Sequence, residues 1–454
     1  LDNHKEGDFN PYLYKSTDLG ETWTSIASNL PKRNLVWRLV QDHIAKDLMF
    51  CATETAIYVT INGGKSWNKV PGAPTISFRD ITIQKRENDL VGASFGRGFF
   101  VLDDYSALRE MTSENLSKEG KLFNTRDALW YLPKSTIGNT GGDYYFAQNP
   151  DFGAVFTYHL SKSYPSMKSD RKKVEREMIK KGQQIPGIDW DAIEKEGREE
   201  TTKIYVVVKD LNGNIINKIS APKSKGLNRV AWNLRHSSAT AINPDRLPRS
   251  GRGGRGWYNS GQLASPGSYT ATLVKEDEGV SIELDDPITF NVVDLERGTL
   301  QGMSYEEYNT HAENLISVQN RQSILSDNMN ETMNMVKAMR VSLSRSKSVN
   351  NELSKRLFDI EEQLNQLSKK VYGNSAKSEV GVKNDPTVSS YIGNAYRGLT
   401  STYGPTGQHK QSLNIANSML DKLYVELDAI SGNLPNLKVE LDKMSAPLII
   451  GANN

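Results

Sequence analysis

The sequence has very little cysteine and no long apolar run. Its 454 residues include one cysteine, Cys51, which excludes an internal disulfide framework. Cys51 lies in the apolar stretch 48–52, which predicts a buried small side chain rather than a reactive thiol. A membrane-spanning helix needs roughly 18–20 apolar residues, and the closest candidate, 446–450, is far too short. The sequence therefore predicts no direct membrane span.

The net charge of the chain is small, and the sequence has no recognisable catalytic motif. The formal net charge is +2, which gives no global field to attract nucleic acid or an anionic membrane. The six histidines are scattered, with no pair at metal-ligand spacing. We find no zinc or haem motif, no phosphate-binding loop and no nucleophile elbow. We therefore predict no metal, no cofactor and no catalytic residue in this chain, and no nucleic-acid partner.

Two related eight-residue boxes stand near the start of the chain. Residues 16–23 read STDLGETW and residues 60–67 read TINGGKSW, which places Trp23 and Trp67 44 residues apart. A four-stranded propeller blade repeats every 40 to 50 residues or so. In such a box an Asp or Asn side chain bonds its own backbone, glycine supplies positive φ, and the tryptophan returns to the sheet.

These boxes resemble the Asp-box, or BNR, repeat, S/T-x-D-x-G-x-x-W. The second box has Asn62 in place of the Asp, which keeps the side-chain acceptor. The residues that match the motif are interpreted as structural. They are Asp18, Gly20, Trp23, Asn62, Gly64 and Trp67.

Residues 94–104, SFGRGFFVLDD, resemble the last blade motif of the large sortilin-like BNR proteins of Bacteroidetes. In that family a His usually precedes Gly-Arg-Gly, and here Phe95 holds its place. With short strands and turns every 8 to 12 residues or so, residues 1–111 are predicted to be the terminal blades of a β-propeller. Two boxes cannot close a propeller, so we expect further N-terminal blades, missing from this sequence, as a partner.

Residues 112–139 are predicted to be a connector, and residues 140–298 a second β domain. The latter has about seven short strands, which favours an immunoglobulin-like sandwich. The stretches VAWNLR at 230–235 and PGSY at 266–269 resemble the FlgD-like module of the same family. A helical insertion is expected at 166–200, where a basic and an acidic helix pair with each other; an anion site is the alternative.

Residues 299–454 are predicted to be a helical bundle. Apolar residues step by three and four along two helices, which buries one stripe of each. The stripes are Leu353, Leu357, Ile360, Leu364, Leu367 and Val371, then Leu413, Ala416, Leu420, Leu423, Leu427, Ile430 and Leu434. The cluster Met329, Met333, Met335 and Met339 favours core packing over an adaptable binding face. From Glu296 onward, 17 Lys and Arg balance 17 Asp and Glu.

The loop 249–258, RSGRGGRGWY, is cationic and aromatic. In a chain of balanced charge we interpret it as a mobile hairpin loop or a docking arm for a partner protein, rather than a nucleic-acid site. The candidate contact residues are Arg249, Arg252, Arg255, Trp257 and Tyr258.

The fold class predicted is multi-domain, mainly β plus α: partial propeller, immunoglobulin-like sandwich with a helical insertion, and helical bundle. The resemblance implies an exported protein, in the periplasm or at the outer surface of a bacterium. The leading hypothesis is a non-catalytic binding or scaffolding protein with other protein subunits as partners. One alternative is a sialidase-like BNR glycoside hydrolase with its site in the missing blades, near which Arg79 and Asp80 would form a rim. The other is a sortilin-like receptor, so glycan and peptide both stay open as ligands.

Overall fold

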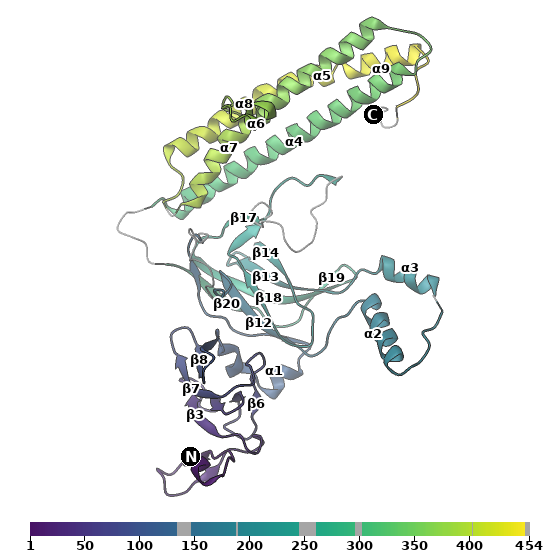
Figure 1. Cartoon of the computed structure of the whole chain (residues 1–454). Coiled ribbons are helices and arrows are strands. Elements are labelled where there is room, and N and C mark those ends of the chain that lie inside the picture. Colours follow the sequence, from purple (N-terminus) through teal and green to yellow (C-terminus); the bar gives the residue numbers. More distant parts are fainter. Residues whose placement is uncertain (134–146, 188, 245–259, 296–301, 402, 450–454) are drawn as a thin grey trace. The chain divides into compact units, whose positions relative to one another are not determined.

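The computed structural model describes residues 1–133, 147–187, 189–244, 260–295, 302–401 and 403–449. Strands dominate up to residue 294 and helices follow, so the chain mixes β and α structure and ends in a helical region, as expected (Figure 1). Two compact units are present. The first holds residues 1–129, 137–234 and 266–293, and the second holds 130–136, 235–265 and 294–454.

The first unit begins with three antiparallel sheets. A two-stranded ribbon pairs β1 (Tyr14–Lys15) with β2 (Thr24–Ser25). A four-stranded sheet follows in chain order: β3 (Val36–Gln41), β4 (Met49–Thr53), β5 (Ile57–Thr60) and β6 (Asn68–Lys69). A three-stranded sheet has β7 (Phe78–Gln84), β8 (Asp89–Ser94) and β9 (Phe99–Leu102). Short helices η1 (His4–Glu6), η2 (Ser106–Glu110) and α1 (Ser113–Ser117) flank these sheets.

β4 lies at the centre of this region because both of its faces are apolar. All five of its residues are buried, in the order Met, Phe, Cys, Ala, Thr. Cys51 is fully buried, which confirms the prediction made for it, and burial raises the pKa of its thiol to about 12.

Two further sheets complete the first unit. A three-stranded sheet orders β10 (Gly120–Leu122), β12 (Ala154–Leu160) and β15 (Gly226–Trp232). A larger sheet orders β11 (Ala128–Trp130), β20 (Ile288–Asp294), β18 (Gly267–Asp277), β13 (Lys203–Asp210) and β14 (Ile215–Ala221), with β19 (Val280–Glu283) paired to β18. The segment expected to be a connector thus contributes β10 and β11 to the sheets.

Aromatic side chains join these two sheets. Phe156 of β12 and Phe290 of β20 meet edge to face, with ring centroids 5.3 Å apart. Trp232 of β15 meets Tyr269 of β18 at 5.4 Å. β12 alternates buried and half-buried residues along its whole length, as a strand with one face on a core does. The two sheets therefore pack face to face around an aromatic core.

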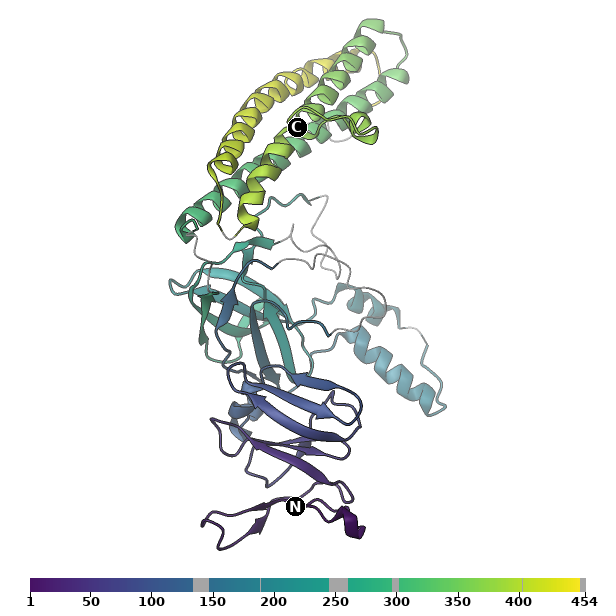
Figure 2. The same ribbon diagram turned by 60° about the vertical axis from the view of Figure 1, so that its left-hand side comes forward.

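Two helices stand where the helical insertion was predicted. α2 (Met167–Lys180) and α3 (Trp190–Arg198) project from the β-sheets of the first unit (Figures 1 and 2). Ser166 and Asp189 cap their N-termini by accepting bonds from Ser169 N and Ala192 N. We call this pair of helices, residues 166–187 and 189–200, the helical arm.

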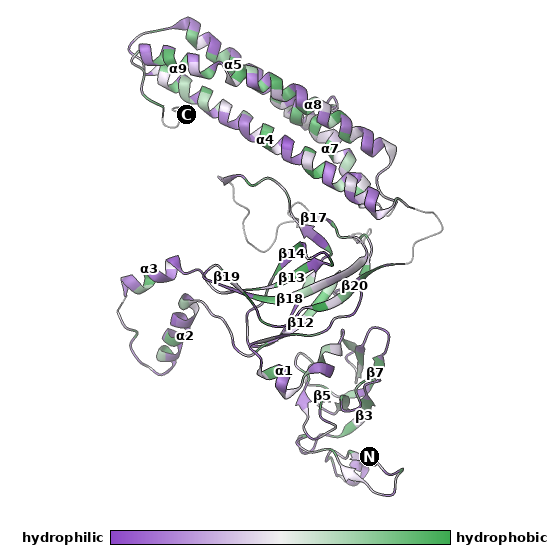
Figure 3. Cartoon of the chain, turned by 180° about the vertical axis from the view of Figure 1, so that it is seen from behind, coloured by the Kyte–Doolittle hydropathy of each residue, from purple (hydrophilic) through white to green (hydrophobic). Residues whose placement is uncertain are grey.

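The second unit pairs β16 (Arg235–Ser237) with β17 (Ser260–Leu263) and holds the C-terminal helices. The helices are α4 (Tyr305–Ser344), α5 (Asn351–Tyr372), α6 (Ser375–Glu379), α7 (Val388–Arg397), η4 (Gly398–Thr400), α8 (Gly407–Ser431) and α9 (Leu434–Lys443). Figure 3 shows apolar and polar residues interspersed along each long helix. In the described residues, no helix has the length and apolarity needed to cross a membrane.

The predicted stripes form the core of these helices. Every stripe residue of α5 is buried, and those of α8 are buried up to Ile430. Leu434 is partly buried against the same core. Met329 and Met339 are buried and Met333 and Met335 pack against them, so the core interpretation of the methionine cluster is confirmed.

Candidate functional site

The first Asp box is a turn held by its own side chains. Asp18 Oδ1 accepts bonds from Ser16 Oγ at 2.7 Å and from Thr22 N at 2.9 Å. Ser16 Oγ in turn accepts a bond from Gly20 N at 2.8 Å, and Gly20 has φ +100°. The carboxylate is therefore committed to the backbone of the turn.

The second box repeats the network with an amide. Asn62 Oδ1 accepts bonds from Thr60 Oγ1 at 2.8 Å and from Ser66 N at 3.0 Å, while Gly64 N donates to Thr60 Oγ1 at 3.0 Å. Asn62 occupies the position of Asp18 in the second box, and its amide oxygen accepts the bonds that the Asp18 carboxylate accepts in the first. The six box residues lie in two turns and not in a common site.

The two box tryptophans differ in environment. Trp67 is 2% exposed, and its indole Nε1 donates to Ile26 O at 2.7 Å. Asn29 holds the backbone of Trp67 from both sides, at 2.7 and 2.9 Å. Trp23 is 63% exposed, and its indole bonds only back to Gly20 O of its own turn among the described residues. The expectation that both indoles return to a sheet holds for Trp67 and is wrong for Trp23, which lacks a described counterpart of the segment 26–29.

The cationic loop 249–258 lies outside the residues that the structure describes. This includes all of its candidate contact residues, Arg249, Arg252, Arg255, Trp257 and Tyr258.

Two β-bulges create a surface that the motifs did not reveal. The register shifts between Val36 and Arg38 in β3, and between Phe78 and Asp80 in the neighbouring β7. A bulge places two successive residues against one of the partner strand and redirects their side chains. Arg79 and Asp80 are consequently both exposed, although Phe78 and Ile81 on either side are buried.

An arginine stacked on aromatic rings forms the centre of this surface. The guanidinium carbon of Arg79 lies 3.8 Å from the ring centroid of Trp37 and 5.1 Å from that of Phe95. Such cation–π contacts contribute about 0.5–2 kcal/mol each, depending on burial. Phe95 is 71% exposed. The rings therefore hold the arginine in place while the aromatic surface stays open to solvent.

Glu54 fixes the Trp37 ring and the polar groups beside it. Its Oε2 accepts a bond from Trp37 Nε1 at 2.7 Å and from Ser77 Oγ at 3.1 Å, and lies 3.8 Å from Arg79. Arg38 and Asp80 form a second, exposed ion pair at 3.4 Å. We call Trp37, Arg38, Glu54, Arg79, Asp80 and Phe95 the stacked surface.

A buried ionic cluster near the stacked surface is structural. The Asp42 carboxylate, fully buried, accepts two bonds from Arg109 at 2.8 and 2.9 Å and one from Tyr105 OH at 2.7 Å. Burial opposes ionisation of Asp42, but these bonds and those from the Ala45 and Ile44 amides outweigh it, so its pKa lies below the ordinary value. Because solvent does not reach the carboxylate, it holds η2 to the end of β3 and does not meet a substrate.

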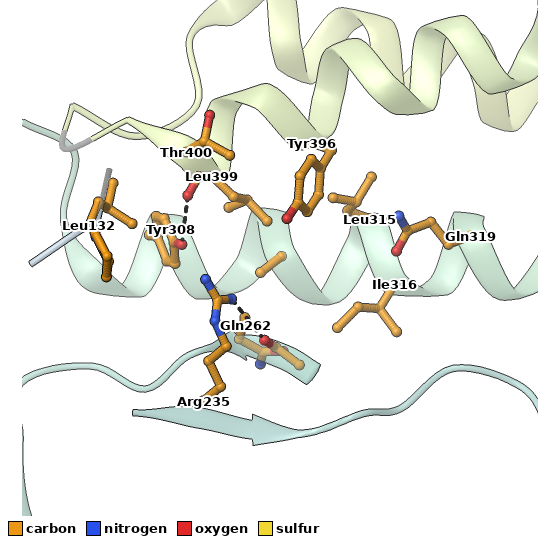
Figure 4. Close-up of a pocket in the computed structure, with 13 residues that line it drawn as sticks. Leu132, Arg235, Gln262, Tyr308, Leu315, Ile316, Gln319, Tyr396, Leu399 and Thr400 are labelled. Atoms are coloured by element: carbon orange, nitrogen blue, oxygen red, sulfur yellow. Dashed lines mark hydrogen bonds between the residues drawn. The ribbon is translucent and has the colours of Figure 1, made fainter. Parts of the chain in front are cut away.

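The second unit carries a groove lined by α4, α7 and the β16–β17 hairpin (Figure 4). It has two adjoining cavities of about 90 and 460 Å³ that share Gly261, Ile316, Gln319 and Tyr396. Arg235 reaches toward α4 and donates to Gly261 O at 3.1 Å. Tyr308 OH donates to Leu399 O at 3.2 Å. Apolar walls with a few polar groups suit a small amphipathic molecule. Among the described residues that line the groove, none are arranged as an acid and base pair.

In the described part of the chain, no group of three or more His, Cys, Asp and Glu residues could hold a metal ion. The buried His311 is bonded to Ala395 O at 3.1 Å, and burial lowers its pKa.

The chain has one weak likeness among solved structures. No protein-family model matches the chain, and no curated protein matches it. One solved structure is similar, the extracellular domain of a one-component system from B. thetaiotaomicron. The identity is 12% and the TM-score 0.17, over 62% of this chain and 28% of that one. The chain thus spans under a third of the length of that structure, and a likeness this weak identifies neither a shared fold nor a function.

Proposed function

We propose that this chain is part of an exported, non-catalytic binding or scaffolding protein of the sortilin-like BNR type, located in the periplasm or at the outer cell surface. In this proposal the first sheets are the terminal blades of a β-propeller and the aromatic two-layer region is an immunoglobulin-like, FlgD-like module. With the C-terminal helices they dock into a larger cell-envelope assembly. The observation that carries the proposal is the stacked surface.

The stacked surface has the composition of a protein-binding hot spot. Hot spots are enriched in Trp, Tyr and Arg held in a fixed arrangement, since little side-chain entropy is then lost on binding. Trp37 and Phe95 hold Arg79, and Glu54 holds Trp37, before any partner arrives. The exposed Arg38–Asp80 pair adds little to stability and leaves both charges available to a partner.

Further blades N-terminal to this sequence are part of the proposal, and Trp23 supports them. Trp67 is covered by the segment 26–29, which follows the preceding box. If the repeat continues, Trp23 would be covered by the corresponding segment of an upstream blade. The exposure of Trp23 is what this arrangement predicts when the upstream blade is not part of the chain described.

The experiment compares Phe95→Ala and Arg79→Ala with the matched control Phe358→Ala, which alters a 56% exposed phenylalanine of α5 in the other unit. Each variant is expressed in the native cell, cross-linked, and its attached envelope subunits are quantified. Losing a hot-spot residue lowers affinity by about 2 kcal/mol, or roughly thirty-fold. We expect the same subunits to be lost from both stacked-surface variants and retained by the control.

Two outcomes would contradict the proposal. Equal subunit yields from all three variants would remove the stacked surface as the binding site. Turnover of a sialyl or glucan substrate by the purified chain, abolished by Glu54→Gln or Asp80→Asn, would favour the glycoside hydrolase instead, because these carboxylates lie beside Arg38 and Arg79.

A further inference from the structure

The helical arm lacks a core of its own. Among the described residues of α2 and α3, none is buried. Its apolar side chains are open to solvent instead: Val174 is 59% exposed and Trp190 71%, and Met167, Ile179 and Ile193 are exposed as well. Helices of 14 and 9 residues are too short to be stable by propensity alone, so tertiary contacts have to hold them.

The arm is nevertheless held in a defined shape. Arg171 bonds Glu196 of α3 through two nitrogens, at 2.6 and 3.0 Å, and Glu175 of its own helix at 2.6 Å. Glu199 accepts bonds from Met167 N at 2.9 and 3.0 Å, which joins the start of α2 to the end of α3. These contacts fix the pairing of the helices and leave their apolar side chains uncovered.

Charge is divided unevenly between the two helices. Residues 166–181 carry seven Lys and Arg against three Asp and Glu, a net charge of +4. Residues 189–200 carry six Asp and Glu against two Lys and Arg, a net charge of −4. A surface of one sign, such as an anionic membrane or a nucleic acid, would attract one helix and repel the other.

We infer that the helical arm is the contact through which two copies of this chain associate, with α2 of each copy against α3 of the other. A two-fold axis places the same patch of both copies face to face, so the basic helix meets the acidic helix twice. The exposed apolar side chains of both arms are covered in the same contact. Since two short helices per copy make a small interface, the dimer is reversible and sensitive to salt.

The test uses charge exchange in the full chain. An acidic variant carries Lys172→Glu and Lys173→Glu, which lowers the net charge of residues 166–181 from +4 to 0 and leaves residues 189–200 at −4. A basic variant carries Asp191→Lys and Glu194→Lys, which raises the net charge of residues 189–200 from −4 to 0 and leaves residues 166–181 at +4. Sedimentation velocity at low salt is expected to show dimers for the native chain and at least a tenfold weaker association for either variant alone. Mixing the two variants restores a dimer, because the unaltered acidic helix of one variant then meets the unaltered basic helix of the other.

The control variant changes the charge of helices outside the arm. Lys337→Glu with Lys355→Glu makes the same change in charge on exposed positions of α4 and α5 and is expected to leave the dimer intact. Far-UV circular dichroism verifies that the variants keep their helices, and recovery on mixing shows that they are folded. A native chain that stays monomeric at all concentrations, a variant pair that fails to combine, or binding of the arm to anionic phosphatidylglycerol vesicles instead would overturn the inference.

Discussion

At the scale of single residues, the two box tryptophans form a natural matched pair. They occupy the same position of the same turn, yet one indole is buried and the other is not. Removing a buried tryptophan loses the free energy of its transfer out of water and leaves a cavity. Removing an exposed tryptophan has neither effect.

We therefore expect Trp67→Ala to lower the free energy of unfolding by about 3–5 kcal/mol and Trp23→Ala by less than about 1 kcal/mol. Urea unfolding followed by circular dichroism measures both. Equal losses of unfolding free energy in the two variants would mean that the Trp23 side chain is covered in solution.

Asp42 makes stability depend on pH. Its pKa in the folded chain is below the ordinary value near 3.9, so its contribution is complete at neutral pH and is lost as the pH falls through the lowered pKa. We expect Asp42→Asn to be clearly less stable than the native chain at pH 7. The difference between them should narrow steadily below about pH 4. A gap that stays constant from pH 7 to pH 3 would show that Asp42 does not act as a carboxylate.

At the scale of elements, the spacing of buried residues along the C-terminal helices decides which substitutions lower the stability of the chain. On α8, Leu420 is fully buried and Val425 is 70% exposed. Leu420→Ala is expected to cost about 2–5 kcal/mol and Val425→Ala less than about 0.5 kcal/mol. Thermal unfolding at 222 nm compares them; similar midpoints would show that the helices do not share the core around Leu420.

Much of this level could be read from the sequence, because helix and strand periods are local signals. The stripes of α5 and α8, the arm helices and most strands of the first unit lie where the pattern places them. Strict alternation failed at the bulges. It assigns Arg79 and Asp80 to opposite faces, whereas the shifted register exposes both.

The grouping of residues in the stacked surface could not be found in advance for a second reason, which is that its members are distant in sequence. Trp37 and Arg79 are 42 residues apart and meet only because β3 and β7 are neighbours. Asp42 and Arg109 are farther apart still, and neither belongs to a motif. Contacts of this kind depend on which sheets lie side by side, and a single sequence carries no local pattern for that.

At the scale of the whole molecule, the candidate surfaces are distributed over separate parts of the chain. The stacked surface and the helical arm belong to the first unit, and the groove of Figure 4 belongs to the second. A protein that binds a subunit through one surface and its own copy through another presents two equal subunit sites per dimer. Two linked sites bind a repeated partner more tightly than one, which favours an assembly with repeated subunits.

The burial of Cys51 has a practical consequence. A thiol with a pKa near 12 and no exposed surface is nearly inert toward maleimides at neutral pH, where reaction requires the thiolate. Any cysteine introduced at the surface would thus be the sole position labelled, without removing the native one. A nitroxide attached at residue 173 would report the separation of two arms as a single distance distribution, and one at residue 23 would report whether an upstream blade immobilises that corner of the molecule.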